Sequence, residues 1–185
     1  MNTPASPQKQ QQIDLLKDIF GLVRSLLDES ERACVIIAAA RLDIDLEHLL
    51  KHVLHHHPGG HDPLFEGDRM LGTFSAKISL AYRLGIIAPD LEHSLQMVRK
   101  IRNDFAHQLD SENLHSQGQK ARLSHMVRYI EKTDLYQSGY KGFADKAKSI
   151  EQLQFALCVV SMTISLNSGL KVLSRVNVGK PRDLS

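Results

Sequence analysis

The chain has 185 residues, of which 42% are hydrophobic and 24% charged, the composition of one soluble globular domain. Its formal net charge of +2 excludes a strong general attraction to nucleic acid or to an anionic membrane surface. The charge is uneven, because residues 111–185 carry 11 Lys and Arg against 6 Asp and Glu, so this part is expected to face anions. Cys34 and Cys158 each lie in an apolar run, and we interpret them as buried thiols in a reducing compartment.

The helical spacing of apolar residues predicts an all-α, single-domain bundle of about six helices. The domain should span residues 11–176, between a disordered tail over 1–10 and a flexible tail over 177–185. The first helix is predicted over about 11–27 and the second over about 31–56, with Ser30 as its N-cap. The second helix contains ACVIIAAA, which is apolar almost all round, so residues 34–40 should be nearly all buried.

A third helix is predicted to start after Thr73 or Ser75 and to end at Gly85. The fourth should run from Pro89 to about His107, since proline suits a first helical turn. The fifth is predicted over about 119–132, and the segment TDLYQSGYKGFADK after it is predicted to be a loop packed on the body. No segment shows the alternation that predicts a strand.

The last helix is predicted over about 149–176 and is strongly apolar. Its most apolar stretch, FALCVVSMTISL, has 12 residues and is too short to cross a bilayer, so we expect no membrane association. The start of the chain, MNTPASPQKQQQ, contains no apolar signal-peptide core. The sequence therefore predicts a cytoplasmic protein.

Six of the ten histidines lie between His48 and His61, around the predicted end of the second helix. Three of them share one helical face, an arrangement that can bind a metal ion. However, HExxH is missing and the string runs into a Pro-Gly turn. A solvated helix end, where histidine faces the negative end of the helix dipole, is the better explanation. We predict no metal site and no cofactor.

The segment KISLAYRLGIIAPDLEHSL has the spacing of a helix-turn-helix, with Ala81, Gly85 and Leu91 at its key positions. Its second helix would present Asp90 and Glu92 to the phosphates of DNA, which opposes binding. That helix is also longer than a usual recognition helix. We therefore predict helix packing around a tight turn, and no sequence-specific DNA binding by the chain alone.

The segment MVRKIRNDFAH combines an apolar stripe with a high density of ionisable groups. Its stripe of Val98, Ile101 and Phe105 should face the core. The candidate binding residues are the polar ones around the stripe: Arg99, Arg102, Asn103 and His107. The structural alternative is that these residues only tie neighbouring helices together.

Arg102, Asn103 and His107 are also the candidates for catalysis. Arginine grips phosphate oxygens in a fork and histidine transfers protons near neutral pH, which suffices for metal-independent RNA cleavage. Five residues turn about 140° on an ideal helix, so Arg102 and His107 face apart. They would converge if the helix ended near Ala106 or if two copies met as a homodimer.

Two resemblances follow from these residues. RNDFAH resembles the Arg-Asn-x-x-x-His signature of the higher eukaryotes and prokaryotes nucleotide-binding (HEPN) domains, small α-helical folds that include many ribonucleases. This resemblance implies an HEPN-type ribonuclease or a nucleotide- or anion-binding module that uses Arg102 and His107. An RNA would then be the partner.

The second resemblance rests on three blocks in this order: ESERACVIIAAARLDIDLEHLL, LFEGDRMLGTFSAKISLAYRLGII and VRKIRNDFAH. Together they resemble the mannitol operon repressor (MltR-like) family over roughly residues 28–110. The resemblance implies an all-α transcriptional regulator without a recognised DNA-binding motif. Such a protein is expected to act through a protein partner or an RNA, and to be no enzyme.

Overall fold

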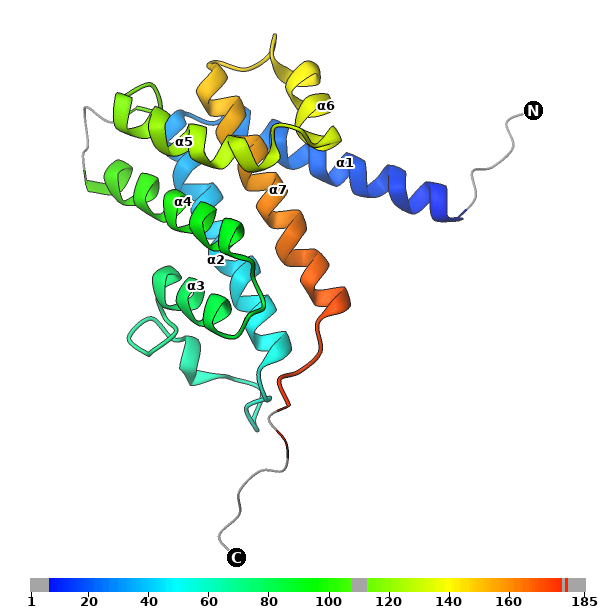
Figure 1. Ribbon diagram of the computed structural model, residues 1–185, viewed down its shortest axis with the longest axis vertical. Coiled ribbons are helices and arrows are strands. Elements are labelled where there is room, and N and C mark those ends of the chain that lie inside the picture. Colours follow the sequence, from blue (N-terminus) through cyan, green and yellow to red (C-terminus); the bar gives the residue numbers. More distant parts are fainter. Residues whose placement is uncertain (1–6, 108–112, 178, 180–185) are drawn as a thin grey trace, which may run out of the picture.

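The structure is a computed structural model that describes residues 7–107, 113–177 and 179, with side chains from residue 17 onward. Within these ranges it contains seven α-helices, one 3₁₀ turn and no strand (Figure 1), so the predicted all-α, single-domain bundle is confirmed. Of the predicted N-terminal tail over 1–10, residues 1–6 lie outside the described residues. Residues 7–10 belong to the first helix rather than to a tail. Most of the predicted tail over 177–185 also lies outside them.

The helices differ from the prediction mainly at their ends. Their bounds are α1 Pro7–Asp28, α2 Glu31–Val53, α3 Phe74–Arg83, α4 Pro89–His107, α5 Gln117–Ile130, α6 Asp134–Phe143 and α7 Ile150–Val172, with the 3₁₀ turn η1 at Pro63–Phe65. Helix α2 ends before its histidine string because Leu54 is extended, and α7 ends at an extended Leu173. The segment after α7 runs beside the C-terminal end of α2, since the amide of Val176 donates to the carbonyl of Val53 at 2.7 Å.

Side-chain and glycine caps fix the ends of several helices. Ser30, Thr73 and Ser149 each accept a hydrogen bond from the amide three residues on, so Ser30 is confirmed as a cap and Thr73 is the cap of α3. Gly85, with φ of +72°, follows α3 as predicted. Its amide donates to Tyr82 and the next amide, of Ile86, to Ala81, which is the Schellman arrangement. The chain thus turns tightly from α3 into α4.

The core lies where α2 and α7 pack along each other, with α1, α3, α4, α5 and α6 around them (Figure 1). Gly169 on α7 allows the close approach, because a Cβ there would lie 2.9 Å from a methyl carbon of Leu49 on α2. Cys34 and Cys158 are buried free thiols, as predicted. Burial raises the pKa of Cys34 to about 12 and that of Cys158 far above its ordinary value, so neither is a nucleophile near neutral pH.

The prediction that residues 34–40 are nearly all buried is wrong for one side of α2. Cys34, Val35 and the alanine pair 38–39 are buried, but Ile37 keeps 46% of its surface exposed. Ile44, about two turns further on, is 52% exposed. The physical reason is that the neighbouring helices cover one arc of α2 and leave the opposite arc open. Composition gives the apolar content of a helix, but it does not predict how many faces of that helix other helices cover.

The segment TDLYQSGYKGFADK is a helix, not the predicted loop. Thr133 caps α6 by accepting from the amide of Tyr136, and Tyr136 and Tyr140 stack one turn apart. Gly139 misled the prediction because glycine disfavours helices. In the structure it faces α7, where a Cβ would lie only 2.5 Å from a methyl carbon of Leu157. The predicted packing against the body is confirmed, since α6 contacts α7.

Helix α7 is the one helix in the described residues that is long and apolar enough, by composition, to cross a membrane. Its 23 residues exceed the 12-residue run on which the prediction rested. Half of its most apolar window is buried inside the protein, and α1, α2, α5 and α6 contact it. These contacts are those of a core helix in a bundle, which passes the same test of length and composition.

Candidate functional site

The segment RNDFAH forms the last turns of α4, and its buried residues are the predicted ones. Val98, Ile101 and Phe105 are inaccessible to solvent. From α2, the Arg32 guanidinium donates to the carbonyl oxygen of Phe105 and so satisfies one of the carbonyls that a helix end leaves without a partner. This end of α4 is therefore fixed to the beginning of α2.

Asp104 ties the same end of α4 to α5. Its carboxylate accepts hydrogen bonds from the Arg122 guanidinium and, at 3.0 Å, from the Gln119 amide. The bond from Arg122 is the main reason why the pKa of Asp104 lies below its usual value, with His107 adding a favourable charge. Within the motif, Asp104 thus has the structural role that the alternative interpretation gave to the whole group.

The candidate binding residues are placed differently. Arg102 and His107 are exposed and Asn103 is half-buried. The Arg102 guanidinium donates to the side-chain oxygen of its neighbour Asn103 at 3.1 Å, and Arg99 donates to Gln96 at 2.9 Å. Helix α4 continues to His107, so Arg102 and His107 stay about 140° apart around it. None of the cavities described below is lined by any of these four residues.

An ion cluster that the sequence analysis missed joins α2 to α3. Lys77 is only 4% exposed, and its ammonium lies 2.9 Å from Asp43 and 2.7 Å from Glu47. Lys51 contacts the other oxygen of Glu47 at 2.7 Å. Burial by itself lowers the pKa of Lys77, but the hydrogen bonds and charges of the two carboxylates outweigh it and raise the pKa. A single lysine among the apolar residues of FSAKISLA was the signal for this cluster.

A second missed cluster lies where three helices begin. His115, just before α5, has one ring nitrogen 3.2 Å from Glu31 on α2 and the other 3.0 Å from Glu151 on α7. Lys120 also contacts Glu151, at 3.1 Å. Burial raises the pKa of Glu151, but backbone and Lys120 hydrogen bonds with the charge of His115 bring it below its usual value. No spacing pattern in the sequence connects these residues, because they come from three separate segments.

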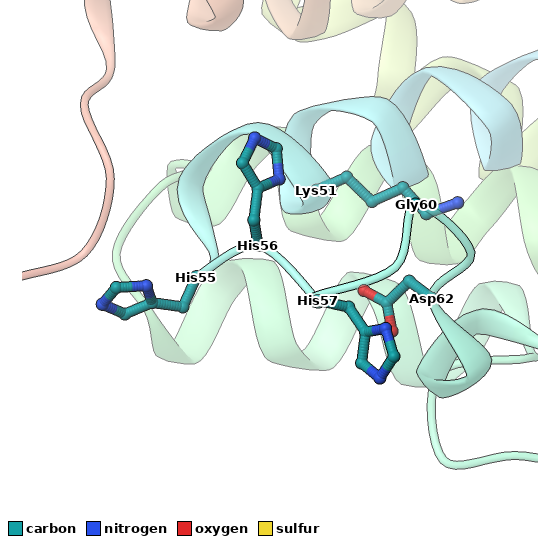
Figure 2. Close-up of a pocket in the computed structure, with 6 residues that line it drawn as sticks. All are labelled: Lys51, His55, His56, His57, Gly60 and Asp62. Carbon is teal, nitrogen blue, oxygen red and sulfur yellow. The ribbon is translucent and has the colours of Figure 1, made fainter.

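The histidine string lines cavities at the end of α2. The cavity in Figure 2 has a volume of about 430 Å³ and is lined by Lys51, His55, His56, His57, Gly60 and Asp62. Figure 2 shows the three imidazoles pointing in different directions. A neighbouring cavity of about 960 Å³ continues along the loop to Met70.

These histidines do not assemble a metal site in the described part of the chain. No group of three His, Cys, Asp or Glu side chains there is close enough to hold an ion. His52 contacts the carbonyl of Leu173 at 3.0 Å, and His61 lies 3.6 Å from Glu66. The arrangement is that of a solvated loop with separate local contacts.

No protein-family model matches the chain, and no curated protein matches it significantly. The end of α4 offers exposed donors and an imidazole that can bind an anion or contact a partner. In the two ion clusters, by contrast, the side chains contact one another across helices.

Proposed function

We propose that the chain is a cytoplasmic regulator that lowers expression of a mannitol operon, and that it acts through a partner protein or an RNA. The three blocks that resemble mannitol operon repressors suggest this function. They correspond to residues 29–50 in α2, 64–87 in η1 and α3, and 98–107 in α4. Helices α2, α3 and α4 all contact one another.

The contacts between the blocks carry the proposal. Lys77 of the second block binds Asp43 and Glu47 of the first, and Arg32 of the first binds the carbonyl of Phe105 in the third. Blocks that resemble a family separately, and that bind one another through their own residues, behave as one structural unit. This supports treating the resemblance as one feature rather than three chance similarities.

The start of α4 supports action through a partner rather than direct reading of DNA. Its first turn carries Asp90 and Glu92, whose carboxylates would repel phosphates. Further along, α4 buries one face against the body, including Leu95, Val98 and Ile101. A helix that enters the major groove presents its N-terminal side chains to the bases, and in α4 these include the two carboxylates.

A promoter reporter tests this proposal in cells. Deleting the gene that encodes the chain should raise expression from the mannitol operon promoter, and restoring the gene should lower expression again. A gel-shift titration of purified protein with operator DNA across salt should show no competitor-resistant complex. Unchanged reporter expression would contradict the regulatory function, whereas a tight specific shift would contradict only action through a partner.

A second candidate function is RNA cleavage or anion binding at Arg102 and His107. The observation in its favour is that both side chains are exposed. Asp104, which lies between them in the sequence, is instead bound by Gln119 and Arg122 of α5. Labelled RNA incubated without metal tests cleavage, using Arg102→Ala and His107→Ala. Lys100→Ala is the matched control, because Lys100 is an exposed cation on the same helix. Equal cleavage by the wild type and all three variants would contradict this function.

A further inference from the structure

A cavity of about 450 Å³ lies where α1, α2 and α7 meet, away from the end of α4. These three helices contact one another pairwise, and α1 and α7 diverge from their contact (Figure 1). The volume is within the range of small-molecule sites, and such sites occur between the helices of bundles. Its apolar wall consists of Ile19, Leu22, Val160 and Ile164.

Polar groups of both signs line the rest of the cavity. Arg41 from α2 uses its Nε to bind both carboxylate oxygens of Asp45 at 3.0 Å, which leaves its terminal nitrogens without a partner among the described residues. Asp18 and Lys171 likewise have no ion pair within the described part of the chain. Asn167 donates to the carbonyl of Thr163 at 2.9 Å, so its side-chain oxygen still can accept a hydrogen bond.

The charges around the cavity balance. Arg41 is paired with Asp45, and the two other charged residues that line the cavity are one acid, Asp18, and one base, Lys171, so the formal charges sum to zero. A charged ligand therefore gains no net attraction, but a neutral ligand with several hydroxyl groups finds both donors and acceptors. The apolar wall suits the C–H faces of such a molecule. We infer that this cavity binds a neutral, polyhydroxylated small molecule, a sugar alcohol or a monosaccharide.

Thr163 is a second observation in favour of a ligand with hydroxyl groups. The residue lines the cavity, is 7% exposed, and its hydroxyl oxygen has no hydrogen-bond partner among the described residues. A buried hydroxyl without a partner is costly, and most are paired. In the structure this oxygen is covered by neighbouring atoms, so a ligand hydroxyl reaches it only after the side chain rotates about χ1. A ligand hydroxyl at that position would satisfy it.

An NMR titration of the ¹⁵N-labelled full chain tests the inference, with D-mannitol, galactitol and D-glucose as neutral probes. Mannitol 1-phosphate and inorganic phosphate are the charged probes. We expect saturable amide shifts, for at least one neutral probe, confined to residues around Asp18, Arg41 and Thr163. We expect inorganic phosphate to leave these amides unchanged.

Two variants and a control make the test specific. Thr163→Val removes the hydroxyl at constant shape, and Lys171→Met removes an exposed donor, so each should weaken binding about fivefold without unfolding the chain. Ser161→Ala is the control, because its hydroxyl on the same helix is also unpaired within the described residues but lines another cavity. The inference is overturned by absent or unsaturable shifts, by shifts elsewhere, by tighter binding of the phosphorylated probe, or by wild-type affinity in both variants.

This inference uses only the residues of the cavity and does not rest on the regulatory function. If the titration showed no binding, the reporter result would be unaffected. If the reporter showed no regulation, the titration result would be unaffected.

Discussion

The ammonium of Lys77 lies 2.7 Å from a carboxylate oxygen of Glu47, and almost none of the lysine is exposed to solvent. The pair joins α3 to the middle of α2, with Asp43 as a second partner at 2.9 Å. A buried charge is tolerated only when it is paired and hydrogen-bonded, so this contact fixes how α3 lies on α2.

Replacing the buried lysine should be costly. Lys77→Met removes the partner of two carboxylates that are only partly exposed, and we expect the free energy of unfolding to fall by about 1–3 kcal/mol. The control is Lys51→Met, since Lys51 binds the same Glu47 but is 40% exposed, and its loss should cost less than about 1 kcal/mol. Urea unfolding measures both; equal losses would contradict a special role for the buried cation.

Acid should destabilise the protein through specific carboxylates. The folded-state pKa values of Asp104, Glu47 and Glu151 all lie below their usual values. Each ionised carboxylate therefore contributes stability that is fully present above its unfolded pKa of about 4 and is lost as the pH falls through the folded pKa. Urea unfolding from pH 7 to pH 3 should show this loss, and Asp104→Asn should make the loss smaller. An unchanged pH dependence in Asp104→Asn would contradict the assignment.

Substituting Asp104 should destabilise the protein more than substituting Arg102. Removing the contact between helices with Asp104→Ala leaves Arg122 and Gln119 without their shared acceptor, so we expect a loss of about 1–2 kcal/mol. Arg102→Ala and His107→Ala alter exposed side chains and should change the free energy of unfolding by less than about 0.5 kcal/mol. Thermal unfolding of the three variants checks this. A large loss in Arg102→Ala would mean that this arginine has a structural role.

The loop before α3 should depend on one glycine. A Cβ at Gly72 would lie 2.1 Å from the carbonyl oxygen of Glu66 and 2.7 Å from the backbone of Gly67, and neither can move cheaply. We expect Gly72→Ala to destabilise the chain by about 1–3 kcal/mol. Gly67→Ala, at a position with no atom within 4 Å, is the matched control and should change little. Similar melting midpoints for the two variants would contradict the tight approach.

Removing the unpaired hydroxyl of Thr163 should stabilise the protein. Valine has the same shape as threonine without the polar group, so Thr163→Val relieves the cost of burying it, and we expect a gain of about 1 kcal/mol. The same variant loses ligand affinity in the titration described above. Loss of both stability and affinity would indicate that the hydroxyl has a partner inside the folded chain.

Local patterns in the sequence were sufficient for the helices and several of their ends. The stripe of Val98, Ile101 and Phe105, the cap at Ser30 and the turn at Gly85 each depend on a few neighbouring residues, so spacing predicts them. The exposed side of α2 at Ile37 and Ile44 could not be predicted in this way, because it depends on which helices pack beside it. Helix α6 was missed because Gly139 is explained only by Leu157 on another helix.

The same distinction applies to the candidate site. RNDFAH was recognisable as a cluster, but its division into a structural Asp104 and exposed Arg102 and His107 depends on Arg122, which is distant in sequence. The contacts of Lys77 with Glu47 and of His115 with Glu31 and Glu151 also join separate segments. Pairings of this kind have no local signature, so only the folded chain identifies them.

The packing of α2 against α7 has a consequence for how the chain folds during synthesis. The two helices are separated by roughly a hundred residues, and closing so long a loop slows the step that joins them. On the ribosome, α2 emerges early, and the apolar surface around Leu49 that packs against Gly169 has no α7 to cover it until much later. The nascent chain therefore exposes this surface while α3 to α6 are made, which is the condition under which chaperones bind and aggregation competes with folding.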